Sequence, residues 1–322
     1  MIKIGIIGAA GYTAGELIRL LLRHPKAELV LLHSSSQVGK PVASVHDDLA
    51  GETDLHFTDQ VNAPELDLLF FCGGHGKTKP FLAAYTLPED LCLIDLSNEF
   101  RLQAPDHDFV YGLPELQREA IRKAQHVANP GCFATCIQLA LLPLADAGEL
   151  KNEVHITAIT GSTGAGQGLS PTSHFSWRNN NLSVYKAFDH QHIPEIEQSL
   201  AQLQPSFGHP LNFVPLRGDF TRGILASVYL RSELSGQAAR DLYAEYYAEE
   251  PFTHLVATNP HLKQVVNTNK GLVQVEKHRD KLHVVSVIDN LLKGASGQAV
   301  QNMNLMFGLE ENLGLGLKAA AF

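Results

Sequence analysis

The chain has 322 residues, 44% hydrophobic and 18% charged, which is a balance typical of globular proteins and a length sufficient for two domains. A formal net charge of -9, with 34 acidic and 25 basic residues in no block of like charge, excludes the electrostatic footprint of a polyanion partner, so we expect no nucleic acid. Neither a signal peptide nor an apolar run of the roughly 20 residues needed to span a membrane is present, so we expect a cytoplasmic protein with no membrane partner.

The first part of the chain alternates short apolar runs with one clear helical pattern. A helix is predicted over 12–24, where Pro25 ends it, and strands are predicted at 2–7, 28–32, 67–72 and 91–96. Nearly continuous apolar strands are typical of a parallel sheet that is buried on both faces. We therefore predict an α/β, Rossmann-type doubly wound domain over roughly the first 130 residues.

From Val154 onward the strand patterns are longer, at 154–160, 224–230, 271–277 and 281–287, with few helices between the last three. This predicts a second α+β domain with a largely antiparallel sheet, and the change of pattern places the boundary near Pro130. Further helices are predicted at 133–144, 195–203 and 298–308.

A turn of small residues joins the first predicted strand to the first helix. Such residues let backbone N–H groups approach a pyrophosphate at a helix N-terminus, which is how a dinucleotide is held. The spacing G-x-x-G-x-x-x-G differs from the G-x-G-x-x-G fingerprint, so an ordinary tight turn is the alternative. The predicted cofactor contacts are Gly8, Ala10, Gly11, Tyr12, Thr13 and Ala14.

The end of the second predicted strand indicates which dinucleotide is bound. An NAD-preferring domain usually places Asp or Glu there, whereas this chain has His33-Ser34-Ser35-Ser36 followed by Lys40. Hydroxyls and a cation suit a 2'-phosphate, so we predict NADP(H), with Ser34, Ser36 and Lys40 as contacts. A serine-rich surface loop without a ligand is the alternative.

Of the four cysteines, Cys132 has a distinctive position. It follows Asn129-Pro130-Gly131 and opens a predicted helix, where the dipole and unpaired N–H groups lower a thiol pKa and can hold an oxyanion. Buried, inert thiols are the alternative, and they suit Cys72, Cys92 and Cys136. The cysteines are too few for a disulfide framework, and no second ligand pair accompanies Cys132 and Cys136, so we predict free thiols and no metal.

Two histidines and two arginines are further candidates for the same chemistry. His190 and His192 lie together before Pro194, where a ring of near-neutral pKa could move protons, although most of the 16 histidines suit surface or core roles. Arg101 and Arg222 could bind a phosphate or carboxylate, with a surface ion pair as an equal alternative.

Five segments, in order along the whole chain, resemble the motifs of N-acetyl-gamma-glutamyl-phosphate reductases, in the semialdehyde dehydrogenase superfamily. The segments are Gly-Ala-Ala-Gly-Tyr-Thr-Ala-Gly-Glu-Leu (8–17), Asp-Leu-Ser-Asn-Glu-Phe-Arg (95–101), Asn-Pro-Gly-Cys-Phe-Ala-Thr (129–135), His-Gln-His-Ile-Pro-Glu-Ile (190–196) and Asp-Asn-Leu-Leu-Lys-Gly-Ala-Ser-Gly-Gln-Ala (289–299). The family usually has Arg where this chain has Gln191 and Gln167, so substrate contacts of those positions are in question.

The resemblance implies an NADP-binding domain of residues 1–131 plus 300–322 and a catalytic and oligomerisation domain of residues 132–299, of the semialdehyde-dehydrogenase and glyceraldehyde-phosphate-dehydrogenase type. It implies Cys132 as the nucleophile and His192 as the acid/base, with His190 beside it. The other implied site residues are Gly164 and Asn290 for the cofactor, and Asn129, Arg101, Glu195 and Arg222 for the substrate.

The implied reaction is NADPH-dependent reductive dephosphorylation of N-acetyl-gamma-glutamyl phosphate in arginine biosynthesis, through a Cys132 thioester. A homodimer or homotetramer is expected. The alternatives are the same chemistry on aspartyl phosphate or a carrier-linked aminoadipyl phosphate, and a non-enzymatic NADP-binding sensor.

Overall fold

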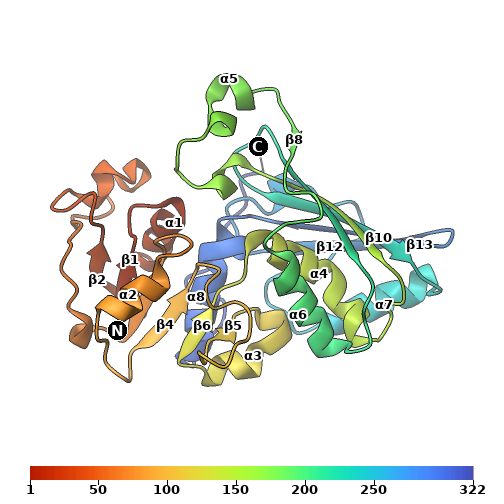
Figure 1. Cartoon of the computed structure of the whole chain (residues 1–322), viewed down its shortest axis with the longest axis horizontal. Coiled ribbons are helices and arrows are strands. Elements are labelled where there is room, and N and C mark those ends of the chain that lie inside the picture. The colour runs from red at the N-terminus through yellow and green to blue at the C-terminus, as the bar shows by residue number, and fades with distance from the viewer. Residues whose placement is uncertain (322) are drawn as a thin grey trace. The chain divides into compact units, whose positions relative to one another are not determined.

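The computed structural model describes residues 1–321, and the chain divides into two compact units (Figure 1). Unit 1 comprises Met1–Pro130 and Ala295–Gly316, and unit 2 comprises Gly131–Gly294 and the residues from Leu317 onward. Among residues 1–321, no helix has both the length and the apolar character that a membrane crossing requires.

This division differs from the predicted one at the C-terminal end. The chain returns to unit 1 at Ala295 rather than at residue 300, and its last residues group with unit 2. The end of the chain is held to unit 2 by two hydrogen bonds, in which Asn267 Nδ2 donates to the carbonyl of Lys318 (3.2 Å) and Ala320 N donates to the carbonyl of Val266 (3.2 Å).

Unit 1 contains a sheet of six parallel strands in the order β2-β1-β3-β4-β6-β5, which confirms the predicted doubly wound parallel sheet. The strands are β1 (Ile2–Ile7), β2 (Ala27–His33), β3 (Leu68–Phe71), β4 (Cys92–Asp95), β5 (Val110–Tyr111) and β6 (His126–Ala128), and the helices are α1 (Tyr12–Leu21), α2 (Thr78–Ala84), α3 (Pro114–Lys123) and α8 (Gly297–Met306). Strands β5 and β6 were not predicted because two and three residues are too few to show a periodic pattern.

The sheet of unit 1 is buried on both faces, as its continuous apolar strands require. Alternate residues such as Ile7, Leu69 and Phe71 pack in one cluster with Phe81 of α2. Their strand neighbours point to the opposite face. Helices α1, α3 and α8 also pack together, with α8 in contact with both of the others.

The turn between β1 and α1 requires glycine at its first position. Gly8 has φ +77°, and a Cβ added there would lie 2.5 Å from the backbone N and Cα of Gly73. We expect Gly8→Ala to lower the free energy of unfolding by about 3 kcal/mol, since left-handed strain and overlap with backbone act together. Gly39→Ala is the control, because Gly39 has a similar φ of +74° with nothing within 4 Å, and it should cost only about 1 kcal/mol. Urea unfolding of both variants measures the difference, and equal losses would contradict the close approach.

Unit 2 contains a seven-stranded sheet in the order β11-β12-β13-β10-β7-β9-β8. The strands are β7 (Val154–Thr160), β8 (Ser183–Val184), β9 (Leu211–Arg217), β10 (Ile224–Arg231), β11 (Thr253–Leu255), β12 (Gly271–His278) and β13 (Lys281–Ile288). The four antiparallel pairs confirm the largely antiparallel prediction, whereas β7 with β9 and β11 with β12 are parallel. The sheet is therefore mixed.

Helix α4 (Cys132–Asp146) is the centre of the core of unit 2. All of its residues from Phe133 to Ala145 are buried, and it contacts strands β7, β10, β12 and β13. Helices α6 (Ile193–Leu203) and α7 (Gly236–Tyr246) also pack against α4, while α5 (Phe175–Arg178) lies in a separate loop (Figure 1). A helix that is apolar all round is held rigidly by such packing, and its first residue is thereby fixed in place.

Candidate active site

Cys132 is the first residue of α4. Gly131 caps the helix in an extended conformation (φ -68°, ψ 146°), and no side chain caps the N–H groups of the first turn. The thiol is half-buried, and Gly294 packs against it so closely that a Cβ there would lie 2.8 Å from the Cβ of Cys132. A thiol at a helix N-terminus lies at the positive end of the dipole and beside donors that can hold an oxyanion.

The other three cysteines are in surroundings that keep them protonated. Burial raises the pKa of Cys136 to about 12, and its Sγ donates to the carbonyl of Ser286 at 3.4 Å. Burial also raises the pKa of Cys72 to about 12 and raises that of Cys92. All four cysteines are free thiols, and only Cys132 begins a helix.

Glu195 and His192 are held against the residue that precedes Cys132. The carboxylate of Glu195, which is 2% exposed, accepts the N–H of Gly131 through Oε2 at 2.9 Å. Its Oε1 lies 3.9 Å from Nε2 of His192. A Cβ at Gly131 would overlap the imidazole of His192, so glycine is what lets this ring pack on the backbone beside Cys132. Glu195, which was predicted to bind substrate, has its carboxylate engaged with Gly131 and lying near His192.

His190 lies behind His192 as a neutral ring. Its Nδ1 accepts the backbone N–H of His192 at 3.2 Å, and the two ring centroids are 4.7 Å apart. Burial, followed by the nearby charge of Lys186, lowers the pKa of His190 to about 4. The imidazole also meets Phe133 and Phe213 edge-on, at 5.4 and 5.3 Å between centroids. These contacts fix its orientation.

The structure adds two residues that the sequence did not single out. The ring of Tyr185 is 5.8 Å from that of His190, and Cζ of Arg217 lies 4.8 Å from the centroid of Tyr185. Burial and then the negative charge of a Cys132 thiolate raise the pKa of Tyr185, to about 12, while the charge of Arg217 and its hydrogen bond with Tyr185 oppose the rise. The tyrosine is thus electrostatically coupled to both groups. Neither residue belongs to the motifs of the family resemblance. The sequence signal that could have identified Arg217 is its position as a charged residue at the end of a strand.

The arginines that were predicted to bind substrate have partners within the protein. Arg222 pairs with Asp289, at 3.0 Å from Nη2 and 3.1 Å from Nε to Oδ2, and because Asp289 is fully buried this is not the surface ion pair named as the alternative. Arg101 is 5% exposed and donates to the carbonyls of Asn129 (2.9 Å) and Leu96 (3.0 Å).

Asn129, also predicted to bind substrate, is 1% exposed. Its Nδ2 donates to the carbonyl of Ala295 (3.1 Å) and its Oδ1 accepts from Asn302 (3.1 Å). With Arg101, it ties the segment after β6 to the rest of unit 1.

The predicted dinucleotide contacts of unit 1 gather at the carboxyl ends of β1 and β2. The N–H groups of Gly8 and Ala9 both donate to the carbonyl of His33 (3.1 and 2.9 Å), which joins the two strand ends. Helix α1 begins directly after Gly11, without a side-chain cap. The first-turn N–H groups of Tyr12, Thr13 and Ala14, which follow Ala10 and Gly11, are thus of the kind that binds an anionic phosphate.

At the end of β2, Ser34 is buried and lies 3.4 Å from Ser36 between hydroxyl oxygens, while the exposed Lys40 donates to Gln37 Oε1 at 2.9 Å. Strand β2 carries no carboxylate at this end, and its last residue is His33. Two neighbouring hydroxyls, with a lysine a few residues further along the chain, are groups of the kind that a 2'-phosphate requires.

Gly164 and Asn290, the two predicted cofactor contacts of unit 2, are neighbours. A Cβ at Gly164 would lie 3.9 Å from Nδ2 of Asn290. The Asn290 side chain is buried, accepts the N–H of Gly223 at 2.7 Å and donates to Oγ1 of Thr163 at 3.0 Å. It therefore fixes the turn that contains Gly164.

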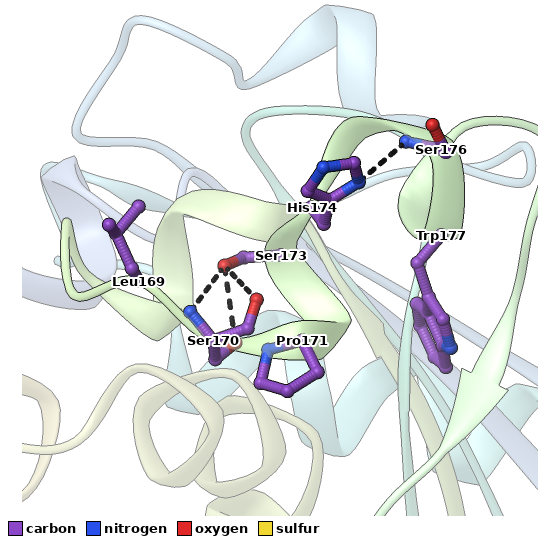
Figure 2. A pocket seen from close by; sticks show the side chains of 7 residues that line it. All are labelled: Leu169, Ser170, Pro171, Ser173, His174, Ser176 and Trp177. Atoms are coloured by element: carbon purple, nitrogen blue, oxygen red, sulfur yellow. Dashed lines mark hydrogen bonds between the residues drawn. The ribbon is translucent and has the colours of Figure 1, made fainter.

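A surface pocket of about 720 Å³ lies in the loop between β7 and α6 (Figure 2). Leu169, Pro171 and Trp177 line it, His174 accepts the N–H of Ser176 at 3.3 Å, and Ser170 and Ser173 close a small capping box. None of the predicted site residues lines this pocket. In the part of the chain that the structure describes, no three His, Cys, Asp or Glu side chains group as a metal site would.

Comparison with known proteins defines the class. Residues 3–124 match the profile of the semialdehyde dehydrogenase NAD-binding domain, and residues 132–290 match the semialdehyde dehydrogenase dimerisation domain. An aspartate semialdehyde dehydrogenase II from Vibrio cholerae shares the fold with a TM-score of 0.74 and 18% identity, over 96% of this chain and 98% of the other. The corresponding enzyme with NADP from Candida albicans has a TM-score of 0.69 and 15% identity, over 97% and 99%. The fold and the cysteine site thus define an NAD(P)-binding semialdehyde dehydrogenase.

Closer relatives narrow this class. The chain is 61% identical to the N-acetyl-gamma-glutamyl-phosphate reductase of Bacteroides thetaiotaomicron and 55% identical to that of Christiangramia forsetii, in both cases over 100% of each chain. It belongs to the N-acetyl-gamma-glutamyl-phosphate reductase family.

Proposed function

We propose that the protein reduces N-acetyl-gamma-glutamyl phosphate to N-acetylglutamate semialdehyde with NADPH, releasing phosphate, as a step of arginine biosynthesis. The observation that carries the proposal is the site itself: a thiol at the first turn of α4, with His192 packed on the preceding Gly131. Whole-length identity of 61% to a reductase of this name supports the choice of substrate.

The reaction begins at the sulfur of Cys132. The thiolate attacks the acyl carbon, a C–S bond forms, and the C–O bond to phosphate breaks as phosphate departs with the electron pair. The N–H groups of the first turn of α4 stabilise the oxyanion on that carbon. NADPH, when bound, supplies the hydride that reduces the resulting thioester. The Cys132 thiohemiacetal then collapses to the aldehyde, and the sulfur leaves with the C–S electron pair.

Proton transfer in this scheme is the role of His192. Its ring packs on Gly131, the residue before Cys132, and Glu195 stabilises its protonated form while holding the N–H of Gly131. His192 accepts the thiol proton before attack. It also transfers the proton of the hemithioacetal oxygen when that intermediate collapses. The neutral His190, whose Nδ1 lone pair is taken by the backbone of His192, positions that residue.

The dinucleotide site is assigned to the glycine turn and the end of β2. Gly8, Gly11 and the first turn of α1 suit the pyrophosphate, and Ser34, Ser36 and Lys40 suit the 2'-phosphate, which favours NADPH over NADH. Gly164 and Asn290 complete the predicted set.

The test is NADPH oxidation by the purified protein with each acyl phosphate. We expect one phosphate released for each NADPH oxidised with N-acetyl-gamma-glutamyl phosphate, and a kcat/KM for it at least about a hundredfold above that for aspartyl phosphate or a carrier-linked aminoadipyl phosphate. A higher kcat/KM for either of these would show that the same chemistry acts on a different substrate. Binding of NADPH without oxidation on any acyl phosphate would favour the sensor.

A homodimer or homotetramer in the cytoplasm is proposed for the working protein. The matching dimerisation profile supports an oligomer, and the sheet of unit 2 has a face opposite α4 that carries half-buried or exposed apolar residues, namely Ile159, Val214, Leu216, Leu225 and Tyr229. Four free thiols suit a reducing compartment. Sedimentation velocity of the purified protein distinguishes dimer from tetramer.

A further inference from the structure

We propose that Arg217 binds the α-carboxylate of the substrate and thereby holds the acyl phosphate end at Cys132. This inference rests on the proposed function and assigns a substrate contact to a residue outside the motifs of the family resemblance. Four observations carry it: the position of Arg217, its lack of a carboxylate partner, the charge around it, and the length of the substrate.

The position follows from a series of contacts within unit 2. Arg217 is the last residue of β9, and Cζ of its guanidinium lies 4.8 Å from the ring centroid of Tyr185. The Tyr185 ring meets His190 at 5.8 Å, and His190 meets His192 at 4.7 Å. Because His192 packs on Gly131, these contacts lead directly to the residue beside Cys132.

Arg217 has no carboxylate partner. Among residues 1–321, no Asp or Glu oxygen lies within 4.0 Å of its guanidinium, and its Nε is buried without a hydrogen-bond partner. Arg222 is different, since Asp289 neutralises it. A buried donor without an acceptor destabilises a fold by roughly 1–3 kcal/mol, so the guanidinium of Arg217 is not neutralised or fully bonded within the protein.

A second cation increases the positive charge at this corner. Arg178 is 7% exposed, and its Nη1 donates to the carbonyl of Arg217 at 2.8 Å. Its other donors are used by the carbonyls of Thr172 and Asn181 and by Ser183 Oγ, so Arg178 is not available to a ligand. Burial and then the charge of Arg217 lower the pKa of Arg178, and Asp219 offsets them in part. An anion is the ligand that this field favours, and the guanidinium of Arg217, which shares one hydrogen bond with Tyr185 and has donors left over, is the group that would bind it.

The length of the substrate distinguishes its two anions. The phosphate is bonded to the carbon that Cys132 attacks, so its ligands must lie next to the sulfur. The α-carboxylate is four carbon–carbon bonds away, or about 5 Å in an extended chain. Arg217 is separated from the histidines by the ring of Tyr185, a spacing that suits the distant anion rather than the leaving group.

The test compares N-acetyl-gamma-glutamyl phosphate with its α-carboxamide analogue, which has the same shape but no charge. We expect wild-type kcat/KM to be roughly 30- to 100-fold lower on the carboxamide, mainly through KM, since a charge-assisted bidentate pair is lost. Arg217→Met should show the same loss on the carboxylate substrate and less than about threefold on the carboxamide. Arg217→Lys should recover part of the loss.

Arg231→Met is the matched control, because Arg231 ends β10 of the same sheet with 73% of its side chain exposed, and it should behave as wild type on both substrates. Equal losses of Arg217→Met on both substrates would overturn the proposal, as would a wild type that does not distinguish them. The wild-type comparison needs no variant and is unaffected by folding. A wild type inactive on both substrates would instead reject the proposed function.

Discussion

Replacing Cys132 with Ser is expected to lower turnover of N-acetyl-gamma-glutamyl phosphate by at least about a thousandfold. A serine hydroxyl at this helix terminus remains protonated near neutral pH and is a poor nucleophile toward an acyl phosphate, so the covalent route closes while the fold is unchanged. The measurement is steady-state NADPH oxidation, together with mass spectrometry of the protein after a single turnover without cofactor. Only the wild type should gain the mass of the acyl group.

Cys136→Ser is the matched control for this prediction. Cys136 lies one turn further along α4, its pKa is raised to about 12 by burial, and a serine hydroxyl can keep its hydrogen bond to the carbonyl of Ser286. This variant should retain at least about a third of wild-type turnover. A near-normal rate in Cys132→Ser, or an equal loss in both variants, would contradict the role of Cys132.

Replacing His192 with Gln is expected to lower kcat by about a hundred- to ten-thousandfold, the usual contribution of a general acid and base. The glutamine amide fills a similar volume but cannot carry the proton. Glu195→Gln keeps an oxygen for the N–H of Gly131 and removes the charge near His192, so a loss of about tenfold is expected, with a changed pH profile of kcat.

His190→Gln separates position from chemistry. The His190 ring is neutral with a pKa of about 4, and a glutamine oxygen can still accept the N–H of His192, so we expect a loss below about tenfold and a pH profile of unchanged shape. Profiles of kcat between pH 6 and 9 test all three variants. A larger loss in His190→Gln than in His192→Gln would indicate that His190, and not His192, carries the proton.

Local sequence determined the elements that position the nucleophile. Strands β1 to β4 of unit 1 were predicted to within a few residues because buried parallel strands are continuous apolar runs that can be read without knowing their neighbours. The start of α4 was predicted to within one residue, because Pro130-Gly131 followed by a helical pattern is itself a local signal.

The functions of the charged side chains could not be predicted in this way. Arg222 and Arg217 are five residues apart and chemically identical, yet Asp289, far along the chain, pairs with the first, and no Asp or Glu within residues 1–321 pairs with the second. The hydrogen bond between Glu195 and the N–H of Gly131 also joins residues that are 64 positions apart.

The sequence alone therefore determined the α/β class, the parallel sheet of unit 1 and the cysteine that opens a buried helix, because periodicity and helix boundaries depend on neighbouring residues. Only the tertiary structure decided which arginine is left without a carboxylate, which histidine is neutral, and that β7 and β9 pair in parallel within a largely antiparallel sheet. These properties depend on groups that are distant in sequence, and burial and electrostatic partners exist only once the chain has folded.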